Sequence, residues 1–219
     1  MDVRRVVDLT QPVSTGSPVY PGDPEVRVDA AATIGADGVN ISRLALGSHS
    51  GTHVDAPFHV RGDGASLDDL DPGLFTGTGV IADVTGRAAR QPIGWADLAP
   101  VAARLGPGRV LLIRTGWDRH WGAPAYADHP HLEPEAVRRV LDLGVRTIGI
   151  DAESVDPASP DAHGLPVHHV VAAAGGVIAE NLANLGAVDF PDPLITLLPL
   201  RITDGDGSPV RAAALEIAP

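Results

Sequence analysis

The chain has 219 residues and a formal charge of −12, from 16 basic and 28 acidic side chains, and 44% of its residues are hydrophobic. This composition can fill the core of one sizeable domain, so we expect residues 1–219 to form a single domain rather than a disordered chain. There is no lysine and no cysteine, which excludes Schiff-base lysines, thiolate nucleophiles, disulfides and cysteine-ligated metal centres.

Short runs rich in β-branched residues, each bounded by glycine, proline or aspartate, predict strands along the whole chain. In chain order they cover residues 3–9, 25–28, 39–46, 80–84, 110–115, 146–151, 194–200 and 210–217. Apolar residues at helical spacing predict helices at 93–105, 134–143 and 167–174. Strands outnumber helices and the two are mixed in order. The expected fold class is therefore α/β, a mixed β-sheet flanked by a few helices.

The chain start and the apolar stretches predict a soluble, cytoplasmic protein. Residues 1–8 contain no apolar core of a secretory signal. The apolar stretch 170–179 includes two glycines and is too short to span a bilayer. We therefore expect no membrane among the partners, and the acidic charge balance argues against a nucleic acid.

Three histidines and one aspartate lie close together in residues 49–59: His49, His53, Asp55 and His59. Side chains alternate along an extended segment, so positions 53, 55, 57 and 59 would share one face. Gly51 permits a bend that could bring His49 to the same point. Two imidazoles and a carboxylate are the ligands expected for a divalent ion such as zinc or manganese.

Two other interpretations of this segment compete with a metal site. The histidines could be surface residues of a polar loop, although three imidazoles and an aspartate at this density disfavour it. Residues 47–51 also have the glycine spacing of a nucleophile elbow, but the central residue is His49 rather than serine. This departure argues against a serine hydrolase.

The string His-Ser-Gly-Thr-His-Val-Asp-Ala-Pro-Phe-His at 49–59 resembles the signature H-x-G-T-H-x-D-x-P-x-H of the cyclase family, which includes bacterial kynurenine formamidases and isatin hydrolases. Further segments resemble the family in order, from about residue 6 to residue 200: 8–12, 19–24, 112–117, 148–156, and His168 followed by Glu-Asn-Leu at 180–182. The resemblance implies a swivelling β/β/α-like fold and a homodimer or homotetramer.

The resemblance also implies a role for each matching residue. His49, His53 and Asp55 would bind one metal ion, and Asp55 and Glu180 would bridge to a second ion that His168 also binds. The cofactors would be two divalent ions per chain, zinc first and manganese as the alternative. His59 would be the general acid/base, a role suited to an imidazole with a pKa near neutrality.

Other polar and aromatic residues have weaker signals. On its own, Glu180 is typical of a solvated position, and only its spacing from His168 selects that histidine over His169. Tyr20 stands where kynurenine formamidases usually present a tryptophan, so we expect it to bind the substrate. His120, His129 and His131 lie in the segment 117–132, which is either a surface loop or a lid over the site. His163 is expected in a loop.

The favoured function is a metal-dependent hydrolase that cleaves an aryl formamide such as N-formylkynurenine, in tryptophan catabolism. The alternatives within enzymes are an isatin-type lactam hydrolase and a biosynthetic cyclase or dehydratase, because the same site serves several reactions. A non-catalytic metal-binding protein is the alternative outside enzymes. His59 argues against it, since a structural metal site needs no acid/base beside it.

Overall fold

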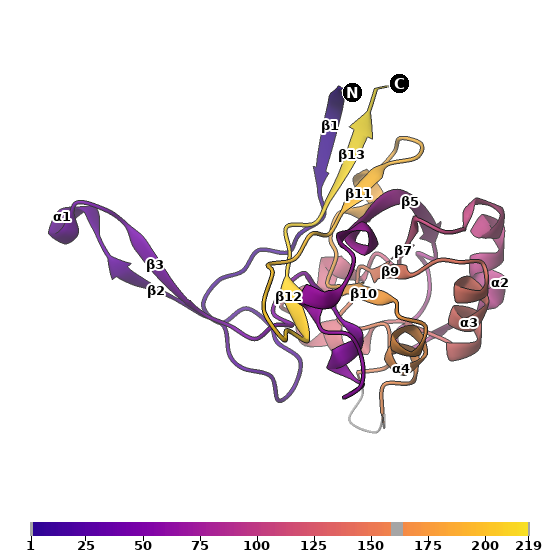
Figure 1. Ribbon diagram of the computed structural model, residues 1–219, viewed down its shortest axis with the longest axis horizontal. Coiled ribbons are helices and arrows are strands. Elements are labelled where there is room, and N and C mark those ends of the chain that lie inside the picture. The colour runs from indigo at the N-terminus through magenta and orange to yellow at the C-terminus, as the bar shows by residue number, and fades with distance from the viewer. Residues whose placement is uncertain (1, 159–163, 219) are drawn as a thin grey trace.

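The computed structural model describes residues 2–158 and 164–218, and its central feature is a nine-stranded mixed sheet (Figure 1). The strands lie in the order β1 (Val3–Asp8), β13 (Ala213–Ile217), β11 (Leu194–Thr196), β5 (Thr76–Asp83), β7 (Arg109–Arg114), β9 (Thr147–Ile150), β10 (Val177–Glu180), β4 (His53–Asp55) and β12 (Gly207–Pro209). β5, β7, β9 and β10 run parallel, and the other pairs are antiparallel. The predicted α/β fold with a mixed sheet is confirmed.

The middle of the sheet is buried on both faces. Along β7, Leu111 and Ile113 belong to one apolar cluster while Val110 and Leu112 belong to another, as the twofold alternation of a strand requires. The helices α2 (Trp95–Leu98), α3 (Pro134–Asp142) and α4 (Pro166–Ala173) contribute to the first cluster. These helices lie together beside the sheet in Figure 1. Both faces of the central strands are therefore shielded from water.

Among the described residues, the remaining strands form two smaller sheets of two strands each. β2 (Arg27–Ala32) and β3 (Ile41–Ala45) form an antiparallel hairpin with the short helix α1 (Ile34–Asp37) at its tip, and this arm projects from the rest of the molecule (Figure 1). β6 (Pro92–Ile93) pairs with β8 (His131–Leu132). Short 3₁₀ helices occupy the connections: η1 (Pro57–His59), η2 (Leu67–Asp69), η3 (Pro72–Phe75), η4 (Ala99–Arg104), η5 (Trp117–His120), η6 (Pro124–Asp128) and η7 (Leu185–Ala187).

Several predicted elements differ from the structure. The helix expected over 93–105 is one α-turn, α2, followed by the 3₁₀ helix η4, because Pro100 has no N–H to continue the α-helical ladder. The strand expected at 25–28 lies at Arg27–Ala32, and the one expected at 194–200 ends at Thr196. The short strands β4, β10 and β12 were not predicted as strands, although they build one end of the main sheet.

The extended geometry expected for 53–59 holds only as far as Asp55. Pro57 begins the 3₁₀ helix η1, so His59 does not continue the alternation of His53 and Asp55. The fixed φ of proline suits the first position of such a turn. Among the described residues, no helix combines the length and apolar character needed to cross a membrane.

Candidate metal centre

The pairing of β4 with β10 brings ligand-type side chains from distant segments together. His53 and Asp55 are two residues apart on β4, and the antiparallel register places Glu180 of β10 directly opposite His53. All three residues are buried. His53 Nε2 lies 3.3 Å from Asp55 Oδ1 and 3.7 Å from Glu180 Oε2. The sheet register therefore builds the centre of the cluster.

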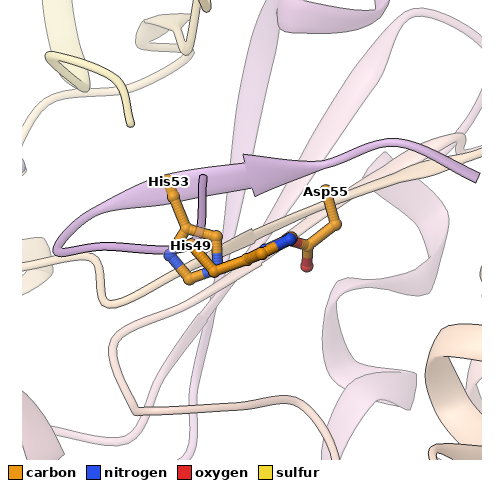
Figure 2. Close-up of side chains that lie close together, drawn as sticks. All are labelled: His49, His53 and Asp55. Carbon is orange, nitrogen blue, oxygen red and sulfur yellow. The ribbon is translucent and has the colours of Figure 1, made fainter. Parts of the chain in front are cut away.

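A tight turn returns His49 to the same point, as expected. Gly51 adopts a φ of 65°, in the left-handed region that favours glycine. His49 Nδ1 lies 2.7 Å from Asp55 Oδ1, and Figure 2 shows the side chains of His49, His53 and Asp55 gathered beside β4. Gly207 on β12 leaves room for the ring, because a Cβ there would lie 2.7 Å from His49 Cε1.

His168 on α4 completes a second group with Asp55 and Glu180. Its Nε2 lies 3.4 Å from Asp55 Oδ2 and 3.4 Å from Glu180 Oε1. His168 is buried whereas its neighbour His169 is exposed. This agrees with the selection of His168 over His169 from the spacing to Glu180. Asp55 thus faces both groups, one oxygen toward His49 and His53 and the other toward His168.

Hydrogen bonds hold two of the imidazoles in the tautomer that a metal ligand needs. His53 Nδ1 donates to Gly51 O at 2.8 Å, and His168 Nδ1 donates to Asp156 Oδ2 at 2.7 Å. When the ring is neutral, its Nε2 atom carries the lone pair and is free to bind a metal ion. Such outer partners orient metal-binding histidines and raise their basicity.

The donor set fits divalent ions. His49, His53 and Asp55, and likewise Asp55, His168 and Glu180, each offer one ligand atom within 4.8 Å of the others. Asp55 Oδ2 is buried and has no hydrogen-bond partner, so a ligand-type oxygen is left without a donor from the protein. Imidazole nitrogen and carboxylate oxygen are common zinc and manganese donors.

The electrostatics of the cluster also favour a cation. Burial opposes protonation of His168, but Glu180, Asp156 and Asp55 outweigh it and raise its pKa well above the ordinary value. Burial likewise opposes ionisation of Asp55, yet the surrounding imidazoles lower its pKa well below the usual range. The buried carboxylates therefore attract positive charge, and a divalent cation can replace the imidazolium protons.

His49 also contacts an acidic residue that the sequence did not single out. Its Nε2 lies 2.9 Å from Asp206 Oδ2, and Asp206 precedes β12, the strand next to β4. Burial lowers the pKa of His49, but Asp55 and Asp206 outweigh this and raise it to about 9. Asp156 was missed in the same way, although the segment containing it was recognised. No local signal marks either residue, because each acts on a histidine distant in sequence.

His59 lies beside the cluster and between its two groups. Its ring centroid is 4.0 Å from that of His49 and 5.8 Å from that of His168. Its Nδ1 lies 3.6 Å from Asp206 Oδ2, so His49, His59 and Asp206 form a third set of ligand-type groups. Burial, together with the neighbouring imidazoles, lowers the pKa of His59. A neutral imidazole at this point can accept a proton.

A cavity of about 380 Å³ opens over the cluster. His49, His53, His59, His168 and Glu180 line its inner part, and Tyr20, Trp121, Glu153 and Leu165 contribute to its wall. Tyr20, the residue expected to bind the substrate, is 37% exposed in this wall. Aromatic faces of this kind bind planar rings through stacking or edge contacts.

The segment 117–132 is partly exposed, as a surface loop would be, and partly buried. It forms η5, η6 and β8, and Tyr126 and His129 within it are buried. Tyr126 donates its hydroxyl to Asn181 Oδ1 at 2.8 Å, which ties the segment to the residue after Glu180. Of this segment, Trp121 reaches the cavity wall. His120 and His131 are half-buried and do not line the cavity, and His163 lies outside the described residues.

Comparisons with known proteins show the family and the fold of the chain. A family model described as a putative cyclase matches residues 7–157. A kynurenine formamidase of Delftia acidovorans is 37% identical over 221 residues, covering 98% of this chain and 99% of that protein. Isatin hydrolase A from Ralstonia solanacearum superimposes with a TM-score of 0.87 at 26% identity, covering 97% of this chain and 92% of the other. A protein from Bacillus stearothermophilus that is described as a predicted metal-dependent hydrolase gives a TM-score of 0.73 at 25% identity, covering 97% of this chain and 98% of the other.

Proposed function

Since the chain belongs to the cyclase family, we propose that it is a metal-dependent hydrolase that cleaves the amide bond of an aryl formamide such as N-formylkynurenine. The observation that carries the proposal is the buried cluster of imidazoles and carboxylates at the base of a cavity with aromatic walls. The kynurenine formamidase relative, similar over nearly the whole chain, supports the choice of substrate class.

We assign His49, His53 and Asp55 as the residues that would hold one divalent ion, and Asp55, His168 and Glu180 as those that would hold a second. Zinc is the first choice and manganese the alternative, since the donors are nitrogen and carboxylate oxygen. Bound divalent ions lower the pKa of a coordinated water and polarise a carbonyl oxygen. The short distances from both oxygens of Asp55 to histidines of both groups support the shared role.

His59 is the proposed general acid/base. In the hydrolysis, the water oxygen bonds to the formyl carbon, the carbon–nitrogen bond breaks, and formate and an aryl amine leave. An amine leaves poorly as an anion, so its nitrogen must gain a proton. His59 lines the cavity beside both groups and is placed to accept the proton of the attacking water and return it to that nitrogen.

Turnover of a small substrate panel tests the proposal. The purified protein, loaded with zinc or with manganese, should hydrolyse N-formylkynurenine and formanilide with a higher kcat/KM than isatin. The isatin hydrolase neighbour makes lactam opening the second candidate function. A clear preference for isatin would select that candidate. If neither metal form hydrolyses any of the three substrates, the proposal that the protein is an amide hydrolase is refuted.

We also propose that the protein is a homodimer or homotetramer held by the β2–β3 arm. Four large apolar side chains of the arm are more than half exposed: Ile34 at 65%, Val39 at 52%, Ile41 at 54% and Leu44 at 63%. Exposed apolar side chains on a projecting element are typical of an association surface. A cytoplasmic location stays a prediction.

Light scattering of the wild-type protein should give the mass of two or four chains. The double variant Ile34→Asp with Leu44→Asp should shift it to one chain, because each interface would bury unpaired carboxylates. Circular dichroism would check that the variant is folded. If the wild-type protein has the mass of one chain, or if the mass of the variant is unchanged, the proposal that the arm forms the interface is contradicted.

A further inference from the structure

The carboxylate of Asp206 faces two imidazoles that have different proposed roles. Its Oδ2 atom lies 2.9 Å from Nε2 of His49, a proposed metal ligand, and 3.6 Å from Nδ1 of His59, the proposed acid/base. The first distance is that of a hydrogen bond, whereas the second is slightly longer than one. Contacts of catalytic groups are often this loose in the free enzyme and tighten when the substrate binds. One oxygen atom thus connects the metal group to the acid/base.

The backbone around Asp206 is held on both sides of that residue. The carbonyl oxygen of Asp206 accepts a hydrogen bond from Ala56 N at 2.9 Å, and that of Gly205 accepts one from Leu67 N at 2.7 Å. Gly207 then begins β12, which pairs with β4. The side chain of Asp206 is therefore presented from an anchored backbone, which a group that orients catalytic residues needs.

The outer partners of the other two proposed ligand imidazoles are of a different kind. Nδ1 of His53 faces the backbone oxygen of Gly51 at 2.8 Å, and Nδ1 of His168 faces Asp156 Oδ2 at 2.7 Å. Asp156 is buried, and its carboxylate also accepts hydrogen bonds from backbone N–H groups at the start of α4. The carboxylate of Asp206 is instead 41% exposed and reaches an imidazole outside the two ligand groups.

We propose that Asp206 is a positioning residue that fixes the tautomers of His49 and His59 together. The inference rests on the proposed function and adds a residue to it. When His49 binds an ion through Nδ1, the nitrogen that faces Asp55, its Nε2 carries the proton and donates to Asp206. The same carboxylate favours the proton of His59 on Nδ1. The Nε2 atom of His59 then keeps the lone pair that accepts the proton of the attacking water.

Zinc affinity tests the first half of this role without any substrate. Asp206→Asn keeps the shape but removes the charge, and should weaken zinc binding by roughly 10–100-fold in competition with a chelator, the usual cost of changing an outer partner of a metal ligand. Asp204→Asn is the matched control, because that residue is exposed in the same loop and asparagine tolerates its φ of 53°. An unchanged affinity in Asp206→Asn would overturn the proposal. Loss of a whole ion at saturating zinc would also overturn it, since Asp206 would then be a direct ligand.

The tautomer of His59 tests the second half, again without turnover. In the zinc-saturated protein with isotope-labelled histidine, nuclear magnetic resonance should show the proton of the His59 ring on Nδ1. His59→Ala assigns this signal by removing it. In zinc-saturated Asp206→Asn the proton should shift toward Nε2, because no charge then favours Nδ1. The same tautomer in both proteins would overturn the proposal.

A double-mutant cycle connects the tautomer to the reaction. At saturating zinc, Asp206→Asn should lower kcat for formanilide by roughly 10–100-fold. It should cause no further loss in the His59→Ala background, because the carboxylate then has no acid/base to orient. Equal losses in both backgrounds would overturn the positioning role. If the wild type hydrolyses no formamide, the proposed function fails, and the zinc and tautomer measurements still decide the role of Asp206.

Discussion

Asp55→Asn should abolish turnover and lower the metal content from about two divalent ions per chain to less than one. One oxygen of Asp55 lies 2.7 Å from His49 Nδ1, and the other lies 3.4 Å from His168 Nε2. Asparagine keeps the shape but carries no charge, and one of its two terminal atoms is an NH₂ group that cannot coordinate. Both groups of ligands would therefore lose a member in a single substitution.

Elemental analysis and turnover of the same preparations check this prediction. Asp63→Asn is the matched control, because that carboxylate is exposed on the surface and pairs with Arg61. Unchanged metal content and activity in Asp55→Asn would show that Asp55 is not a ligand. A wild type that saturates at one ion would remove the bridging role of Asp55 and Glu180, and a value near zero would end the metal proposal.

His59→Ala should lower turnover of a formamide with a poor leaving amine by roughly 10²–10⁴-fold, the usual size of a general acid/base contribution. The metal content should stay near wild type, because His59 is proposed to transfer a proton rather than to coordinate an ion. Formamides with activated leaving groups need less protonation and should lose less. The pattern across substrates distinguishes proton delivery from a general disturbance of the site.

The competing role for His59 is coordination, since His49, His59 and Asp206 also bring ligand-type atoms together. Loss of metal along with activity would make His59 a ligand. Retained activity on every substrate would make it a bystander. His169→Ala is the control, because that imidazole is exposed next to His168 and should leave both metal and turnover unchanged.

The sequence alone determined those parts of the site that are local. His49, His53 and Asp55 lie within seven residues, so a glycine turn and one short strand suffice to bring them together. The helix α3 was predicted for the same reason, from Pro134 at its start and Gly144 after its end. His168 was chosen over His169 as the candidate ligand because its spacing from Glu180 matches the family pattern.

Only the tertiary structure decided which distant residues join this local group. Glu180 is buried because β10 lies between β9 and β4, a neighbourhood that the pattern of its own segment does not reveal. Asp206 reaches His49 because β12 pairs with β4. Local preferences set turns and helix ends, whereas strand order and register depend on contacts between segments far apart in the chain. The candidate ligands could therefore be proposed from the sequence, but the carboxylates of Asp156 and Asp206 that contact their imidazoles could not.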